Sequence, residues 1–390
     1  MKAQTIPLRE LCDVRIGRTP SRSDQRLWGG TGVWISISEL NGGELRDSKE
    51  HISEIAIRDV MPPPVPAGTL LFSFKLSIGK MAVSAVPLYT NEAIAALPIR
   101  DPDRLDREYL RYALMATSGA AQTNHAVLGA VLNKAKVEAL PIPLMPIAEQ
   151  RRIVDLLSRA ENIVRMRREA EKKAKEIIPA LFLDMFGDPV TNPRGWEVNC
   201  LSEIVTFVSG GTPSKARDDY WRGLLPWVSP KDMKVAEIFD AEDHISDQVP
   251  VQTSIKLIAP GAVLIVVRGM ILAHTVPVAI TRAPVTINQD MKALRPKNSI
   301  SSEYLMWLLR ISQQWLLTLV SSAAHGTRKI DTARLEALRI PVPPRAMQES
   351  FVQRVGTILS VNAGQNRAAE RADQAFQSLL AGVFSEGVEI

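Results

Sequence analysis

The sequence predicts a mixed α/β protein in which two similar domains, related as a pseudo-two-fold repeat, are joined by two long antiparallel coiled-coil helices. Three observations predict this fold class: an internal repeat, short strand-like apolar runs in each copy, and a helical heptad pattern after each copy. We place the first domain at 1–145, the first spacer helix at 146–187, the second domain at 188–343 and the second spacer helix at 344–390.

The repeat is read from identical short segments. Thr-Pro-Ser at 19–21 recurs at 212–214, and His-Ile-Ser at 51–53 recurs at 244–246, both at an offset of 193. Further along, Asn91 aligns with Asn288 at an offset of 197, and Glu-Ala-Leu at 138–140 aligns with 336–338 at 198. Several identical tripeptides at nearly one offset indicate duplication rather than two unrelated α/β domains.

Each domain mixes strands, turns and one helical stretch. The runs at 32–37, 69–74 and 261–267 are rich in apolar and β-branched residues and predict strands. Helices are expected over 107–117 and 302–320. Breakers such as Gly42-Gly43 separate these elements, which is typical of compact mixed domains.

A long helix is expected after each domain. From 148 to 186 the only strong breaker is Pro179, which we expect to kink the helix, and Gly187 stops it. The predicted heptad has a positions Ile153, Ala160, Arg167, Ala174 and Leu181, and d positions Leu156, Ile163, Ala170, Ile177 and Asp184. The pattern recurs 198 residues later in the same phase. A helix of this length spans about 55–60 Å at about 1.5 Å per residue and delivers the chain to the second domain at its far end. If the two ends of that domain lie near each other, as domain termini often do, the second helix must run back along the first. The alternative is two unrelated amphipathic helices, each packed on its own domain.

Composition and motifs point away from catalysis. The net charge of +5, from 47 Lys and Arg against 42 Asp and Glu, allows a polyanionic partner without demanding one. Gly79-Lys80 is followed by Met81, so there is no phosphate-binding loop, and Pro62-Pro63 lacks the flanking residues of a methyltransferase motif. The two cysteines and five histidines are not spaced as metal ligands. His51 and His244 are expected to be turn or fold residues rather than catalytic ones. We therefore predict neither a catalytic nor a metal site. With no apolar signal segment and no run long enough to span a bilayer, we expect a cytoplasmic protein.

Four motifs occur in the same order in both halves or at their junction. They are a Gly-x-Thr-Pro-Ser loop followed by a Trp (17–21 and 210–214), a proline-rich exit (141–144 and 340–343), a Gln after it (Gln150 and Gln348), and a central junction at 181–196. Together, over essentially the whole chain, they resemble the specificity subunit of type I restriction-modification systems.

This resemblance implies a function. The family has two target-recognition domains separated by an antiparallel helical spacer, and each domain reads one half of a bipartite DNA sequence. It implies a non-catalytic chain that binds no cofactor itself and recruits two methyltransferase subunits, which bind S-adenosylmethionine, and restriction or translocase subunits. Half-sites one helical turn apart lie about 34–36 Å from each other, a distance that the helix pair is long enough to bridge. The alternatives are a self-contained DNA methyltransferase or nuclease, and a coiled-coil scaffold without a nucleic acid partner.

Candidate DNA-binding residues lie in three places, chosen because Arg, Lys, Asn and hydroxyl groups contact bases and phosphates. The first place is the pair of Thr-Pro-Ser loops, with Arg18, Thr19, Ser21, Arg22, Thr212, Ser214, Lys215 and Arg217. The second is the polar tip after a strand, with Lys75, Lys80 and Arg268. The third precedes the exit, with Asn124, Lys134, His325, Thr327, Arg328 and Lys329. Each loop has a plain turn as its alternative. The tryptophans at 28, 34, 221 and 227 are expected in the core rather than as stacking platforms.

Overall fold

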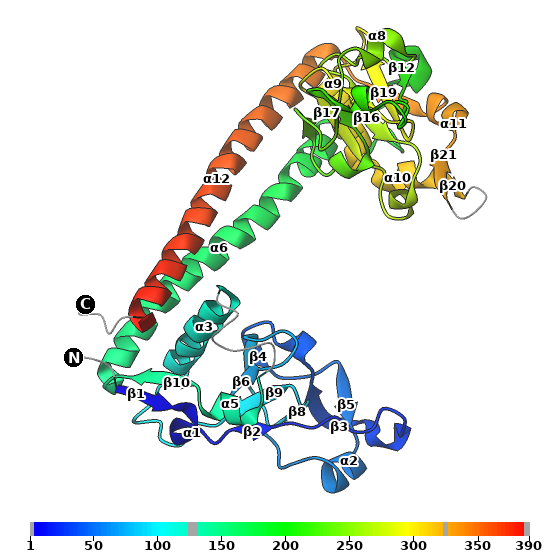
Figure 1. Cartoon of the computed structure of the whole chain (residues 1–390). Coiled ribbons are helices and arrows are strands. Elements are labelled where there is room, and N and C mark those ends of the chain that lie inside the picture. The colour runs from blue at the N-terminus through cyan, green and yellow to red at the C-terminus, as the bar shows by residue number, and fades with distance from the viewer. Residues whose placement is uncertain (1–3, 124–131, 323–326, 386–390) are drawn as a thin grey trace. The chain divides into compact units, whose positions relative to one another are not determined.

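The computed structural model describes residues 4–123, 132–322 and 327–385. The chain forms two compact units: unit 1 comprises Met1–Arg168 with Arg367–Ile390, and unit 2 comprises Glu169–Asn366. Each unit contains one repeat together with part of both long helices, α6 (Ile147–Phe186) and α12 (Arg345–Ser385) (Figure 1). The fold class predicted from the sequence, two mixed α/β repeats with two long helices, is confirmed.

The head of unit 1 is built on two small sheets. The five-stranded sheet has the order β2-β9-β6-β7-β4 and the three-stranded sheet the order β5-β3-β8. The strands are β1 (Gln4–Pro7), β2 (Arg15–Ile16), β3 (Trp28–Ile35), β4 (Glu44–Leu45), β5 (Glu50–Ile52), β6 (Leu70–Ser73), β7 (Met81–Ser84), β8 (Tyr89–Thr90), β9 (Ile94–Leu97) and β10 (Pro141–Leu144). The helices are α1 (Leu8–Leu11), α2 (Glu54–Asp59), α3 (Arg107–Thr123) and α5 (Lys134–Glu138).

The central strands of the five-stranded sheet are continuous apolar runs, and their successive side chains point to opposite faces of the sheet. Both faces of these strands are therefore buried. Leu70 and Phe72 of β6 pack into one core with Tyr109 of α3, whereas Leu71 packs into a second core with Ile35. The head is therefore a layered domain with a hydrophobic core on each side of the sheet.

Unit 2 repeats the two sheets of the unit 1 head strand for strand, and β20 and β21 form a further two-stranded sheet. Its five-stranded sheet has the order β12-β19-β16-β17-β14, and its three-stranded sheet the order β15-β13-β18. The strands are β11 (Glu197–Cys200), β12 (Val205–Ser209), β13 (Leu225–Val228), β14 (Glu237–Ile238), β15 (His244–Ile245), β16 (Val263–Val266), β17 (Val278–Thr281), β18 (Thr286–Ile287), β19 (Met291–Pro296), β20 (Val320–Ser322), β21 (Arg328–Ile330) and β22 (Arg339–Val342). The helices are α7 (Leu201–Ile204), α8 (Val249–Gln252), α9 (Ser302–Ile311), α10 (Gln313–Thr318) and α11 (Thr332–Glu336). The single helix expected over 302–320 is thus divided at Ser312.

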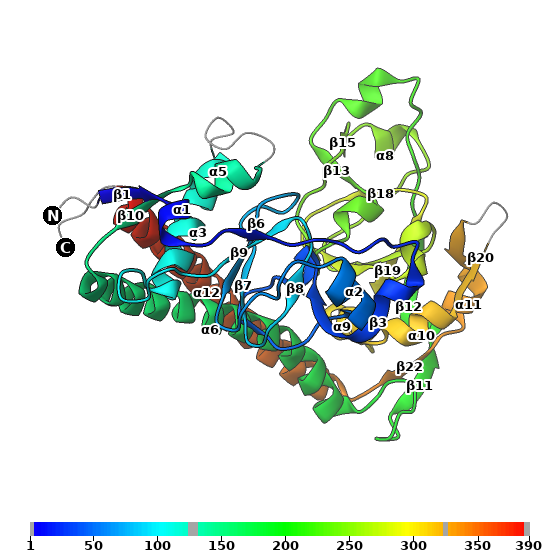
Figure 2. The ribbon, with the colours of Figure 1, turned by 90° about the horizontal axis from the view of Figure 1, so that it is seen from below.

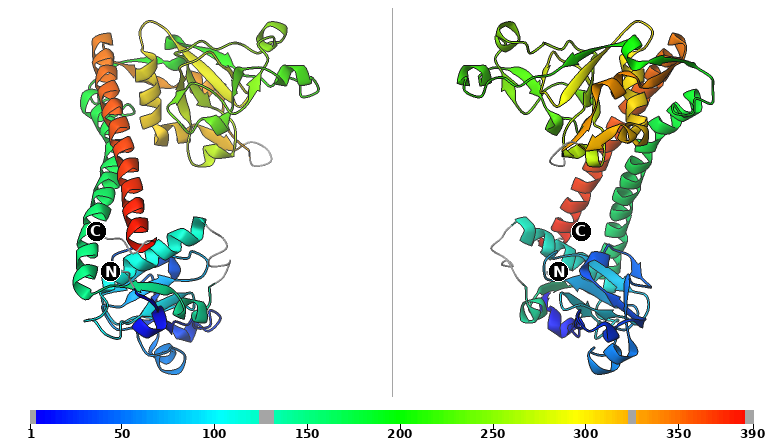
Figure 3. Two further views of the ribbon diagram at one scale, coloured as in Figure 1. Left: turned by 60° about the vertical axis from the view of Figure 1, so that its left-hand side comes forward. Right: turned by 90° about the vertical axis from the view of Figure 1, so that its right-hand side faces the viewer.

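The long helices run antiparallel, as the contacts inside each unit establish. In unit 1, Arg168 near the middle of α6 donates to Asp373 of α12 at 2.8 Å, and the end of α12 lies beside the start of α6 and beside α3 (Figures 1 and 3). In unit 2, Phe182 near the end of α6 packs edge-on against Phe351 near the start of α12, with ring centroids 5.5 Å apart. The first part of each helix therefore meets the last part of the other.

The d positions of the predicted heptad are wrong by one residue. The predicted d positions Leu156, Ile163 and Ile177 are 39%, 50% and 46% exposed, whereas the residues that follow them, Leu157, Val164 and Ile178, are buried. In unit 1, Leu157 belongs to the same core as Tyr109 and Tyr112 of α3. The d positions of α6 are therefore displaced by one residue, about 100° around the helix, whereas the predicted a position Ile153 is buried as expected. The recurrence at 198 survives the correction, since buried Ile153, Leu157, Ile178 and Phe182 correspond to buried Phe351, Val355, Phe376 and Leu380.

Each head is joined to its helix by the same joint. β1 pairs with β10 and β11 pairs with β22, so the first strand of each head lies beside the strand that leads into the long helix (Figure 2). One turn into each helix stands a fully buried glutamine, Gln150 or Gln348. Gln150 accepts a hydrogen bond from Asp106 N (2.9 Å) and donates to two backbone carbonyls, and Gln348 does the same with Ser301 N (2.8 Å). Both amides are thus saturated, which is what burial of a polar side chain requires.

Two further features bear on the sequence predictions. α6 ends at Phe186, and Gly187 follows with a φ of 77°, so the predicted stop is confirmed. Across 4–123, 132–322 and 327–385, no helix is both long and apolar enough to cross a membrane.

Candidate nucleic-acid interface

The two Thr-Pro-Ser loops begin at glycines that no other residue can replace without movement. A Cβ added at Gly17 would lie 2.0 Å from the Thr90 carbonyl oxygen, and one added at Gly210 would lie 1.9 Å from the Asn288 carbonyl oxygen. These separations are far inside van der Waals contact, so each loop passes directly against the turn that precedes β9 or β19. The glycine of the repeated motif is therefore explained by close backbone approach.

Paired tryptophans brace each loop from inside. Each indole N–H donates to a loop carbonyl: Trp34 to Arg18 (3.0 Å), Trp28 to Ser21 (3.1 Å), Trp227 to Gly211 (2.9 Å) and Trp221 to Ser214 (3.2 Å). The rings of each pair pack edge-on, 5.1 Å and 5.2 Å apart. Trp34 and Trp227 are buried, which confirms the core assignment for those two, and the other two are half-buried. The loops are fixed platforms rather than free turns.

A third tie holds the threonine of each loop. The Thr19 hydroxyl donates to the carboxylate of Glu92, and the Thr212 hydroxyl donates to the side-chain oxygen of Gln289. The hydrogen bond from Thr19, together with the nearby charge of Lys75, holds the pKa of Glu92 below its usual value. Glu92 and Gln289 are exposed and occupy equivalent positions, but the sequence analysis did not select them. The available signal was the repeated asparagine, Asn91 or Asn288, that immediately precedes each of them.

In unit 2 the second and third predicted places form one surface. Gly269 N donates to the Arg328 carbonyl at 3.0 Å, and Ile330 N donates to the Val267 carbonyl at 2.8 Å. The loop after β16 therefore lies against the β20–β21 hairpin and brings Arg268, Arg328 and Lys329 together. Arg268 also approaches Asp290, beside the residue that holds Thr212, at 4.0 Å. Cations from two sequence regions thus gather beside the Thr-Pro-Ser loop of this unit.

In unit 1 the corresponding loop between β6 and β7 carries Lys75 and Lys80. The backbone of Phe74 donates to the Ala93 carbonyl at 3.0 Å, which places Lys75 next to Glu92 and hence next to the Thr19 tie. Lys134 begins α5, pairs with Glu138 at 3.6 Å and lines a hollow of about 410 Å³ together with Gly17. Lys75 and Lys134, one from each of the other two predicted places in this unit, therefore lie near its Thr-Pro-Ser loop.

Several predicted cations are already paired with carboxylates. Arg22 makes a two-pronged ion pair with Glu50 and stands 4.0 Å over the Trp28 ring, and Arg217 pairs with Asp219 at 2.6 Å and 2.8 Å. Lys329 pairs with Asp331 at 2.8 Å, and the pKa of Asp331 is lowered by that contact. These pairs are exposed, so each is weak and exchangeable against a phosphate.

Other predicted cations can contact a phosphate without first breaking an ion pair. Within the described chain, Lys80, Lys215 and Arg328 have no carboxylate at ion-pair distance. Lys215 lines a shallow hollow of about 420 Å³ with Asp218, Trp221 and Arg222. Of the remaining predicted residues, Arg18 donates to the Val60 carbonyl (3.4 Å), Ser21 bonds Ser23 (2.8 Å), and Ser214 and Thr327 lie on loops. Asn124 and His325 lie outside the described residues.

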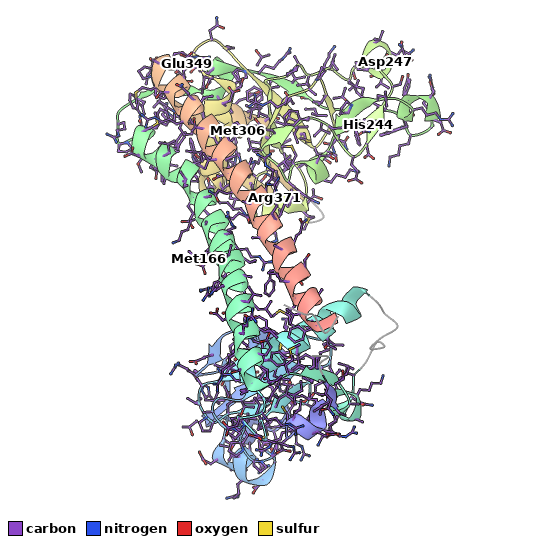
Figure 4. The ribbon with its side chains drawn as sticks, turned by 90° about the vertical axis from the view of Figure 1, so that its left-hand side faces the viewer. Met166, His244, Asp247, Met306, Glu349 and Arg371 are labelled. Carbon is purple, nitrogen blue, oxygen red and sulfur yellow. The ribbon has the colours of Figure 1, made fainter. Side chains whose placement is uncertain are left out.

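The two repeated histidines bridge turns. His51 Nε2 lies 2.8 Å from Asp47, and His244 Nε2, on β15, lies 2.7 Å from Asp240 (His244 is labelled in Figure 4). Each pair closes the turn before β5 or β15, as expected of turn residues. In the ranges that the structure covers, no group of three His, Cys, Asp or Glu residues is arranged to hold a metal ion.

Comparison with known proteins matches one family twice. The model of the type I restriction modification DNA specificity domain matches residues 2–176 and 193–367. The specificity subunit of the type I restriction enzyme EcoR124I/EcoR124II of Escherichia coli is 35% identical over 158 residues, which cover 40% of this chain and only 39% of that protein. The specificity subunit of the MjaIX enzyme of Methanocaldococcus jannaschii is 23% identical over 373 residues, 88% of this chain and 84% of that protein.

The fold is shared with a solved structure as well. A chain from a study of complex assembly and conformational transition of the type I R-M system superposes with a TM-score of 0.66 at 19% identity. The superposition covers 98% of this chain and 97% of that one.

Proposed function

The chain belongs to the type I restriction-modification specificity family, and from that premise we propose that it is the sequence-specific DNA-binding subunit of such a complex. Each head reads one half of a bipartite target, and the helices set the gap between the halves. The chain is non-catalytic and binds no cofactor, and it acts in the cytoplasm on double-stranded DNA. Two methyltransferase subunits, which carry S-adenosylmethionine, dock on it, and restriction or translocase subunits complete the assembly.

The observation that carries this proposal is that one scaffold is used twice with different exposed groups. In both units a glycine, two tryptophans and a threonine fix the Thr-Pro-Ser loop in the same way. The threonine's partner is a carboxylate in unit 1 (Glu92) and an amide in unit 2 (Gln289). A carboxylate only accepts hydrogen bonds, whereas an amide also donates, and these groups suit different base edges. Two such surfaces support an asymmetric bipartite target.

The cations supply the sequence-independent part of binding. Lys80 in unit 1, and Lys215 and Arg328 in unit 2, stand near these loops without a carboxylate partner in the described residues. Contacts of this type position a protein on the phosphate backbone, and their loss weakens binding in a salt-dependent way. The modest net charge of +5 supports a complex in which partner subunits contribute further phosphate contacts.

Exposed apolar side chains on the long helices support docking of two identical partners. Ile163 of α6 is 50% exposed in unit 1, and Val361 of α12, its equivalent at an offset of 198, is 56% exposed in unit 2. Met166 of α6 (Figure 4) is 65% exposed one turn after Ile163, and Leu359 of α12 is 43% exposed. An exposed apolar side chain at equivalent places on the two units suits one copy of the same partner on each.

The decisive experiment compares genome-wide adenine methylation in cells with and without this chain. We expect a bipartite motif to lose its methylation when the chain is absent, and purified chain with its methyltransferase partner to shift only duplexes carrying that motif at moderate salt. No change in any motif, together with no sequence-selective binding, would refute the proposal. Transfer of labelled methyl groups, or DNA cleavage, by the purified chain alone would instead show an enzyme.

A further inference from the structure

Leu76 stands out at the tip of the loop between β6 and β7. Its side chain is 95% exposed and its backbone has a φ of 60°, in the left-handed region. That conformation is unfavourable for a branched side chain, because Cβ crowds the neighbouring carbonyl oxygen. Among the described residues, Asn192 is the other non-glycine residue with positive φ, and there the side chain makes two hydrogen bonds to the backbone of Trp196. Leu76 has no polar group that could make such a compensating bond.

The other repeat shows that the fold does not require leucine here. Leu76 follows Lys75 as Gly269 follows Arg268, at the offset of 193 that relates the two loops. Gly269 also has a positive φ, 133°. Both loops therefore have a positive φ at this point, and glycine adopts such conformations without steric cost. A leucine that is both strained and almost fully exposed contributes nothing to the packing of unit 1, so its side chain is explained by something outside the chain.

The loop presents this side chain in a fixed position. The Ser73 hydroxyl donates to the Ser77 carbonyl and accepts from Lys80 N at 2.9 Å, while Gly79 N donates to the Ser73 carbonyl at 3.0 Å. Three hydrogen bonds to one residue of β6 thus close the base of the loop. An apolar tip held this way loses little conformational entropy when it binds.

The surroundings of Leu76 identify its partner as DNA. Lys75 and Lys80 flank it in sequence, and Glu92 beside Lys75 holds Thr19 of the Thr-Pro-Ser loop. Cations on both sides of an apolar tip match a groove in which phosphates border the base edges. In the major groove the apolar feature is the C5-methyl group of thymine, which aliphatic side chains contact. In unit 2 the same loop carries Met270, 66% exposed, directly after the glycine.

We propose that Leu76 is a specificity-determining residue that contacts a thymine methyl group in the half-site read by unit 1. This inference rests on the proposed function, since it requires that the heads read DNA. Lys75 and Lys80 hold the adjoining phosphates, and the left-handed backbone at position 76 aims the side chain at the base.

The test uses the full chain in complex with its methyltransferase subunits and duplexes carrying the motif found by methylation mapping. Each thymine of the unit 1 half-site is replaced in turn by deoxyuridine, which lacks only the methyl group. We expect the affinity of the wild-type complex to fall about fourfold when one particular thymine is replaced, which corresponds to the free energy of burying about one methyl group. Leu76→Gly and Leu76→Ala should bind thymine DNA at least that much more weakly and become insensitive to deoxyuridine at that position. Leu76→Met, which keeps an apolar tip, should stay close to wild type.

Stability separates recognition from folding in these variants. Glycine adopts the left-handed conformation freely, so Leu76→Gly should unfold at the same temperature as wild type or a higher one while binding DNA more weakly. Met270→Ala in unit 2 is the matched control and should leave the unit 1 half-site unaffected. Equal binding by Leu76→Gly and wild type, a half-site without thymine, or deoxyuridine sensitivity retained in Leu76→Gly would each overturn the inference. Absence of any selective binding by the wild-type complex would refute the proposed function itself.

Discussion

Replacing Gln348 by leucine should loosen the joint between the head of unit 2 and its long helix. The Gln348 amide accepts from Ser301 N at 2.8 Å and donates to the carbonyls of Pro343 (2.8 Å) and Ser299 (3.1 Å). Ser301 and Pro343 are buried, so Gln348→Leu leaves two buried backbone groups without a partner at about 1–3 kcal/mol each. The new apolar side chain offsets part of this loss. We therefore expect a net destabilisation of about 3 kcal/mol.

For a unit of this size, about 3 kcal/mol lowers the midpoint of thermal unfolding by about 6–12 °C. Thermal unfolding of the full chain, followed by circular dichroism, measures the shift. Gln353→Leu is the matched control, because it makes the same substitution at an exposed position of α12. If the two variants unfold within about 2 °C of each other, the hydrogen bonds of Gln348 do not stabilise the joint and the reasoning fails.

The variant Gln348→Glu tests the same joint through the pH dependence of its stability. Burial beside two carbonyl oxygens raises the pKa of the introduced carboxyl group, and its protonated form can still donate one hydrogen bond. A raised pKa in the folded state means that stability is present at low pH and is lost as the pH rises. We expect Gln348→Glu to unfold close to wild type at about pH 4 and well below it at about pH 8. An equal difference from wild type at both pH values would contradict this mechanism.

Three further predictions concern other groups. Burial raises the pKa of Glu161, but the hydrogen bonds and charge of Arg111 outweigh it and hold that pKa below its usual value. The stability that this ion pair contributes is therefore present at neutral pH and is lost as the pH falls through the lowered pKa. Unfolding measured at decreasing pH should show a loss of about 1 kcal/mol, after screening by solvent, in wild type but not in Glu161→Gln. Burial raises the pKa of the Cys12 thiol to about 12, so a thiol reagent should label Cys200 but not Cys12 in the native chain, and both after unfolding. Arg328→Ala should weaken DNA binding of the complex for all sequences and reduce the slope of log K against log salt by about 1; an unchanged slope would exclude a phosphate contact.

The sequence predicts the duplication and the helix pair because repeated segments mark the same points of the fold. It cannot choose the buried face of α6, for a specific reason. Leu156 is followed by Leu157, Ile163 by Val164, and Ile177 by Ile178, so two neighbouring stripes are equally apolar. Periodicity does not separate adjacent apolar residues. The choice is made by α3, whose Tyr109 and Tyr112 pack against one stripe in unit 1.

The sequence indicates the polar loops proposed as the interface, but not the contacts that hold them. The Thr-Pro-Ser loops, the loops after β6 and β16, and Arg328 were found because cations and hydroxyls interrupt apolar patterns. The pairing of Arg22 with Glu50, 28 residues away, could not be read, because it depends on β5 lying beside β3. The hydrogen bond between Thr19 and Glu92 could not be predicted either, because it depends on the Thr-Pro-Ser loop lying against the turn that precedes β9. Leu76 was missed because its interest lies in a backbone angle and an exposure, neither of which has a sequence signal.

The residues that hold each head together are shared by the two repeats, whereas several exposed residues differ between them. The glycine against a carbonyl, the braced tryptophans and the saturated glutamine occur in both units, and in each case the partner is a backbone group. These shared features serve what both units have in common: they fix the Thr-Pro-Ser loop and join the head to its long helix. The exposed groups differ: leucine against glycine at 76 and 269, and carboxylate against amide at 92 and 289. Because the same fold forms with either member of each pair, the fold does not select between them. Under the proposed function, two half-sites of different sequence account for the differences at these positions.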